Sequence, residues 1–198
     1  MATQISKLKI KIRALIEDWL QTDSEVFSYD ANATSPNVFQ LAEGNATTIT
    51  KVYKNLTDIT DSADIDLNTD TAKVTITLGS GDSWIDGDEI EIIYTFYDYS
   101  DTEITEYIRG ALIYFSIYAN SEQDYELETN SISPTPDNRT LDLIAFISAI
   151  EIKPDWNEYV LPNLRVRYNN RIPKDQKIQK LCGLYNHSWG KNDILEFN

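Results

Sequence analysis

The segment from Asp88 to Ile104 reads Asp-Glu-Ile-Glu-Ile-Ile-Tyr-Thr-Phe-Tyr-Asp-Tyr-Ser-Asp-Thr-Glu-Ile, and two kinds of secondary structure meet in it. Its first half alternates polar with apolar residues, which predicts a half-buried strand. The apolar face of that strand consists of Ile90, Ile92, Tyr94 and Phe96. The second half has the form of a capping box, in which Ser100 and Glu103 satisfy each other's backbone donors at the start of a helix. A β region therefore gives way to a helix at this point.

The alternating pattern extends back from this strand to about Val26. Further strands are predicted at Val38–Leu41, Thr48–Tyr53, Ile65–Leu67 and Val74–Leu78. Turn signals rich in Gly, Asn and Asp separate them. Short strands spaced by turns at intervals of about 8–12 residues are typical of a small antiparallel β-sandwich or barrel.

Helical periodicity is found on both sides of the β region. Before the β region, a helix over Ile5–Leu20 would have apolar residues on one face and basic residues on the other, so one face is available for burial. Such a helix can also lie on a membrane surface, but the rest of the chain offers ample apolar surface for packing. After it, a long apolar face begins at Ile104, and Leu141–Ile152 is apolar nearly all round, which predicts a buried helix opened by Pro136. A last helix is expected after Pro173.

The order of these elements predicts an α+β protein in which a helical bundle is interrupted by an inserted antiparallel β-sandwich or barrel. The helical domain is expected to comprise residues 1–25 and 98–198, with a C-terminal tail, and the inserted β domain residues 26–97. Because one domain is split by the other, the two ends of the insert should lie close together.

Composition narrows the classes of function. The chain has 198 residues and a formal net charge of −15, and 16 acidic and three basic residues within 22–101 account for −13 of it. A charge of this sign argues against a protein whose task is to grip nucleic-acid phosphates or anionic membrane. A single cysteine, Cys182, and a single histidine, His187, argue against disulfide frameworks, multi-histidine metal sites and histidine catalysis. No apolar run reaches the length of about 18 residues that a membrane span needs, and no export signal is recognisable at the N-terminus.

No motif for catalysis or cofactor binding emerges. The segment Asp64–Asp70 has oxygen donors at alternating positions like a calcium loop, but Thr69 stands where that loop needs Gly and Thr75 where it needs Glu. An acidic hairpin turn is the simpler interpretation. Carboxylates are numerous, yet no pattern selects two of them as a glycosidase pair. We therefore expect no enzymatic activity, no catalytic residue, no cofactor and no metal.

The layout resembles the head-to-tail connector proteins of tailed bacteriophages, also called adaptor or neck proteins. Three stretches carry the resemblance: the opening amphipathic helix that leads into a β block, the junction from Asp88 to Ile104, and the helix segment Glu106–Leu112. The resemblance implies a structural virion protein that forms a ring, commonly of twelve subunits, between portal and tail. Such a ring extends the DNA channel, with DNA only as a passing neighbour. The implied partners are the portal, the tail or neck proteins and further copies of the chain, without membrane.

The resemblance also suggests roles for surface residues and a location. The protein would reside at the head–tail junction of the virion and in the host cytoplasm during assembly, and its C-terminal segment would reach the portal. The candidate partner-binding residues are Trp189, Ile194, Leu195, Phe197, Tyr97 and Tyr99. The candidate acidic residues facing the channel are Asp64, Asp66, Asp70, Asp82, Asp86 and Asp88.

Other interpretations remain open at this point. The tail can fold back on its own helices rather than dock on another subunit, and the acidic residues can simply form a solvated surface that resists aggregation. A tail-side structural protein, such as a terminator, tube or baseplate component, has a similar mixture of elements. A glycan-binding module is a third possibility, because the β block is rich in aromatic residues.

Overall fold

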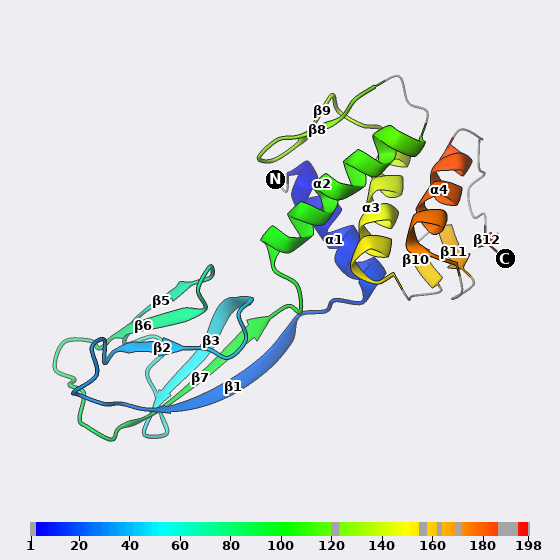
Figure 1. Cartoon of the computed structure of the whole chain (residues 1–198). Helices are drawn as coiled ribbons and strands as arrows, with labels where there is room; N and C mark the ends of the chain where they lie inside the picture. Colours follow the sequence, from blue (N-terminus) through cyan, green and yellow to red (C-terminus); the bar gives the residue numbers. More distant parts are fainter. Residues whose placement is uncertain are drawn as a thin grey trace. The chain divides into compact units, whose positions relative to one another are not determined.

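The protein is a mixed α+β structure with four helices and antiparallel sheets among the residues described (Figure 1). The computed structural model describes residues 3–119, 123–154, 158–161, 164–168, 172–185 and 194–197, with the backbone alone at 158–161, 164–168, 184–185 and 194–197. The chain divides into two compact units. We call Met1–Asp18 together with Ser100–Asn198 the helical unit, and Trp19–Tyr99 the β unit. Each is described by itself.

Four helices form the helical unit, and their starts follow from local sequence. They are α1 (Gln4–Ile16), α2 (Asp101–Tyr118), α3 (Asn138–Ile152) and α4 (Lys174–Tyr185). The capping box predicted at the start of α2 is present, with Ser100 and Glu103 exchanging hydrogen bonds. The expectation that Pro136 opens α3 is wrong, because Asp137 is the N-cap residue and accepts a hydrogen bond from the Thr140 amide. A carboxylate acceptor satisfies a free amide at the helix start, which proline in that position does not do.

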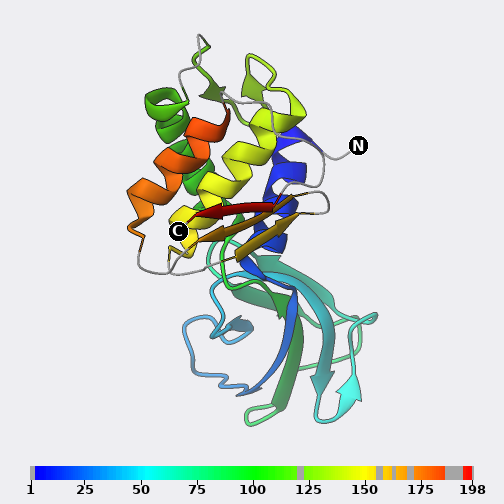
Figure 2. The same ribbon diagram turned by 90° about the vertical axis from the view of Figure 1, so that its right-hand side faces the viewer.

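Helix α3 contacts each of the other three helices, and Figures 1 and 2 show it, in yellow, between them. From Leu143 onward its apolar residues are buried on every side, as the sequence predicted. Burial of apolar residues from all four helices around α3 is the main source of stability in this unit. Among the described residues, no helix combines the length and the apolar character that crossing a membrane requires.

Short strands complete the helical unit. They are β8 (Glu126–Leu127), β9 (Ile132–Ser133), β10 (Glu158–Leu161), β11 (Leu164–Tyr168) and β12 (Ile194–Phe197). β8 and β9 form a small antiparallel hairpin between α2 and α3. β11 is the central strand of a second sheet, antiparallel to β10 and parallel to β12. The backbone of the C-terminal tail at 194–197 is thus part of a sheet of its own chain.

Seven strands form the β unit. They are β1 (Gln21–Ser28), β2 (Val38–Gln40), β3 (Ala46–Lys54), β4 (Thr57–Asp58), β5 (Asp64–Asn68), β6 (Lys73–Thr77) and β7 (Glu89–Phe96). They pair in two sheets with the orders β1-β7-β3-β4 and β2-β6-β5, and they do not close into a barrel. All five predicted strands are present, whereas β1 and β4 were not predicted. Residues 21–25, which the sequence assigned to the helical domain, belong to β1.

The two sheets share one cluster of buried side chains. In β7 the residues alternate between buried and half-buried, so the predicted inner face is confirmed. Tyr94 of that face is fully buried, and its hydroxyl donates a hydrogen bond of 2.5 Å to Glu25 of β1. Burial together with this carboxylate raises the pKa of Tyr94. The mostly polar strand β1 is therefore held by backbone pairing with β7, by this contact and by Phe27, which packs against the shared core.

Candidate functional site

The six acidic residues proposed to face a channel do not form one cluster. Asp64 and Asp66 are exposed on the solvent side of β5, and Asp70 is exposed in the turn that follows. Asp64 pairs in register with Thr77, so it lies at the opposite end of the β5–β6 hairpin from Asp70. The remaining exposed members, Asp82 and Asp86, lie between β6 and β7. In the part of the chain that the structure describes, no group of three or more His, Cys, Asp or Glu residues could hold a metal ion.

Asp88 differs from the other five because it is only 6% exposed. Its carboxylate pairs with the Lys54 amine at 3.0 Å and accepts hydrogen bonds from the side-chain amide of Asn55 at 2.7 Å and the backbone N–H of Ile85 at 2.8 Å. Burial alone would raise the pKa of Asp88, but these donors outweigh it and hold the pKa below its ordinary value. Asp88 thus stabilises the turn before β7 and is not available to face a channel.

The proposed partner-binding residues are described only in part. Tyr97 and Tyr99 are half-buried at the C-terminal end of the β unit. Trp189 lies outside the described residues, as does His187. Ile194, Leu195 and Phe197 lie in β12, whose backbone pairs with β11 of the same chain. The tail backbone therefore adopts the fold-back arrangement at these positions.

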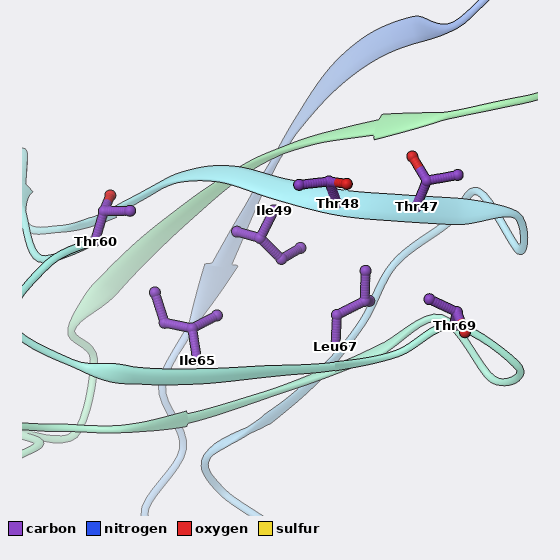
Figure 3. Close-up of a pocket in the computed structure, with 7 residues that line it drawn as sticks. All are labelled: Thr47, Thr48, Ile49, Thr60, Ile65, Leu67 and Thr69. Carbon is purple, nitrogen blue, oxygen red and sulfur yellow. The ribbon is translucent and has the colours of Figure 1, made fainter. Parts of the chain in front are cut away.

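A hollow of about 360 Å³ lies in the β unit between β3 and β5 (Figure 3). Its lining residues are Thr47, Thr48, Ile49, Thr60, Ile65, Leu67 and Thr69. In Figure 3 the side chain of Ile49 points from β3 toward β5, while Ile65 and Leu67 point from β5 toward β3. These three side chains are half-buried and pack against the shared core. The hollow is thus an uncovered margin of that core.

Bulges in β3 keep this margin open. The register between β3 and β7 shifts between Ala46 and Thr48 and again between Ile49 and Lys51. Each shift adds a threonine, and the hydroxyls of Thr47 and Thr50 donate hydrogen bonds to carbonyls of β7 at 3.0 and 2.9 Å. Beyond β3, the short strand β4 pairs only with the last two residues of β3. Most of the outer edge of β3 is therefore irregular, and no strand within Trp19–Tyr99 covers it.

The chemistry of the hollow suits binding more than catalysis. All seven lining side chains are Thr, Ile or Leu, and none of these is an acid or base near neutral pH. The Thr60 hydroxyl is already engaged, accepting from the Val52 amide at 2.9 Å and donating to Asp58 at 2.6 Å. The hollow therefore offers apolar contact beside a strand edge.

Ionic contacts join the two places where the helical unit is interrupted. Arg13 on α1 pairs with Asp18, the last residue before the β unit, and its guanidinium also binds Asp101 at 2.9 Å. Lys9 approaches the other oxygen of Asp101 at 3.2 Å. Burial favours protonated Asp101, but the hydrogen bonds from Arg13 and Lys9 hold its pKa below the ordinary value. We call Arg13, Asp18 and Asp101 the junction clamp. Sequence reasoning missed it, because Asp101 lies 88 residues away from Arg13 in the sequence.

The helical unit also presents apolar side chains to solvent. Ile113 and Ile117, one turn apart on α2, are 58% and 62% exposed. Ile113 borders a groove of about 480 Å³ between α2 and β8, together with Arg109 and Tyr125. By contrast, Cys182 of α4 is buried in the core, and this burial raises the pKa of its thiol to about 12.

Comparisons with protein-family models, with curated proteins and with solved structures found no match to this chain.

Proposed function

We propose that the protein is a structural component of a tailed-bacteriophage virion that forms a ring between portal and tail, extends the DNA channel and joins head to tail. One observation carries the proposal: α1 packs against α2 and α3, although the β unit separates α1 from them in the sequence. This layout, with its strand-to-helix junction, resembles the connector proteins. In this interpretation the helices form a bundle and the two sheets of the insert a sandwich.

Exposed apolar residues on the helices support assembly with other copies. A ring closes when one face of each subunit binds a different face of the next. Ile113 and Ile117 on α2 supply one such face, and Ile10 on α1, which is 64% exposed, lies on another helix. Association would remove these side chains from water, which is favourable for apolar surface.

The charge of the β unit agrees with a neighbour of DNA that does not grip it. Trp19–Tyr99 carries 15 acidic and three basic side chains, a net charge of −12. Phosphates are repelled by such a surface, so a duplex would slide past it. The five exposed carboxylates among the candidate residues are the ones that could act in this way.

The test is the mass of the assembly in solution together with negative-stain images of the full chain, alone and with portal. A twelvefold ring supports the connector proposal, and the double variant I113E/I117E should prevent ring formation while Thr102→Glu, on the same helix, should not. A sixfold or threefold assembly would instead favour the second candidate, a tail-side structural protein. A monomer that binds glycans would contradict both.

A second test concerns the tail. In the proposed connector, removal of residues 187–198 abolishes attachment to the portal and leaves the helical unit folded. Because this deletion also removes β12 from its sheet, Trp189→Ala provides a milder variant for the same attachment assay. Normal attachment by both variants would contradict a docking role for the tail.

A further inference from the structure

We propose that β5 is a docking edge for an extended basic segment of another protein, which adds to the sheet as a strand and covers the hollow between β5 and β3. The partner segment has Lys or Arg alternating with Val, Ile or Leu. This site is separate from the helix faces and the tail considered above, and it does not depend on the connector assignment.

The backbone of β5 is suited to strand addition. β5 pairs only with β6 within Trp19–Tyr99, and its five residues keep a continuous register without a bulge or proline. In an antiparallel pair, alternate residues turn their N–H and C=O groups away from the partner strand, and at an edge these groups are open to a further strand. Across the hollow, β3 is bulged, and bulges are a common means of blocking edge pairing. The regular edge is therefore β5.

The inner face of β5 requires an apolar partner. Ile65 and Leu67 are half-buried and face Ile49 across the hollow. A strand paired beside β5 places every second side chain on this same face. Side chains of the size of Val, Ile or Leu in these positions would cover the margin of the core and remove apolar surface from water.

The outer face of β5 selects the charge of the partner. Asp64 and Asp66 are exposed on this face, in a unit with a net charge of −12. Residues directly beside one another on adjacent strands attract when their charges are opposite and repel when they are alike. Lys or Arg beside each aspartate therefore favours pairing, and the same aspartates reject an acidic strand.

A second copy of this chain does not meet these requirements. Pairing of β5 with another β5 would bring aspartates together. Two segments of the chain do alternate basic and apolar residues, Lys7–Arg13 and Leu164–Tyr168. The first lies within helix α1, and the second is β11, which already has a strand on each side. The partner segment therefore belongs to a different protein.

The experiment uses the full chain and a short, blocked, fluorescent peptide in which Lys alternates with Val. Binding is measured by anisotropy, and amide hydrogen exchange of Ile65 and Leu67 should slow when the peptide is bound. Asp66→Lys should weaken binding about tenfold, equivalent to about 1.4 kcal/mol, and should allow a Glu–Val peptide to bind. Asp23→Lys is the matched control, because Asp23 is an exposed aspartate on β1, an edge strand of the sheet that does not contain β5.

Three results would overturn the proposal. One is equal binding of a peptide of the same composition with its lysines in a single block, because charge alone would then suffice. Another is equal loss of affinity in Asp23→Lys and Asp66→Lys. The third is self-association of the free protein with protection of the β5 amides, which would make a second copy the occupant. Absence of a twelvefold ring would leave all these measurements unaffected, so the two proposals fail separately.

Discussion

The junction clamp provides the sharpest test of how the helical unit tolerates its interruption. In Arg13→Met the guanidinium is lost while the carboxylate of Asp18 stays buried. The side chain of Asp18 is 0% exposed and that of Arg13 is 9% exposed, whereas that of Asp101 is 71% exposed. Breaking a buried pair from one side costs about 3–5 kcal/mol, and an exposed pair contributes at most about 1 kcal/mol. We therefore expect Arg13→Met to lower the free energy of unfolding by about 4 kcal/mol.

The structure also predicts an asymmetry within the clamp. Asp18→Asn should cost less than Arg13→Met, because Arg13 keeps its contact with Asp101. The double variant R13M/D18N removes both buried charges and should be more stable than Arg13→Met alone. The interaction between the two positions appears as non-additivity in this double-mutant cycle.

Urea unfolding followed by the helical circular-dichroism signal measures these differences. Lys7→Met is the matched control, because Lys7 is an exposed basic residue on the same helix, and its effect should stay within about 0.5 kcal/mol. An Arg13→Met variant as stable as this control would refute the reasoning. So would strictly additive effects of Arg13→Met and Asp18→Asn, because the two side chains would then act independently.

Three further predictions concern single positions. Glu17→Gly should raise the free energy of unfolding by about 0.5–1 kcal/mol in urea unfolding, because Glu17 ends α1 with a φ of 56°, where glycine is not strained; a decrease would contradict this. Lys177→Met should lower the free energy of unfolding by about 1–3 kcal/mol, because the buried amine donates a hydrogen bond to the Pro154 carbonyl at 2.5 Å. An unchanged urea midpoint would show that this hydrogen bond is dispensable. The pKa of Asp58 is lowered from 3.8 to about 2 by hydrogen bonds, first from Lys51, so ionised Asp58 stabilises the fold fully above about pH 4 and progressively less toward pH 2. The stability difference between wild type and Asp58→Asn should therefore shrink over that interval, and a difference independent of pH would argue against this pairing.

Local patterns in the sequence were sufficient to predict elements whose stability depends on nearby residues. Alternation along β7 identified its inner face, and the capping box identified the start of α2. These predictions succeed because side-chain periodicity and helix capping act over a few residues. Pro136 shows the limit of this approach, since Asp137 supplies a better cap one residue later.

Elements that depend on distant partners could not be predicted in this way. β1 is mostly polar and exposed, and it is a strand because β7 lies beside it. Asp88 was expected to face a channel, yet it is buried and bound to Lys54 and Asn55. The hollow beside β5 depends on bulges in β3, which no local pattern indicates.

Local sequence patterns were enough to predict the mixed α+β class, the four helices, five of the seven strands of the β unit and the concentration of negative charge there. Packing of distant segments sets which carboxylates are buried, which strand edges are open and how one arginine joins both sides of the interruption. The difference follows from the range of the interactions. Periodicity and capping are properties of neighbouring residues, whereas burial, register and ion pairing are properties of segments that only folding brings together.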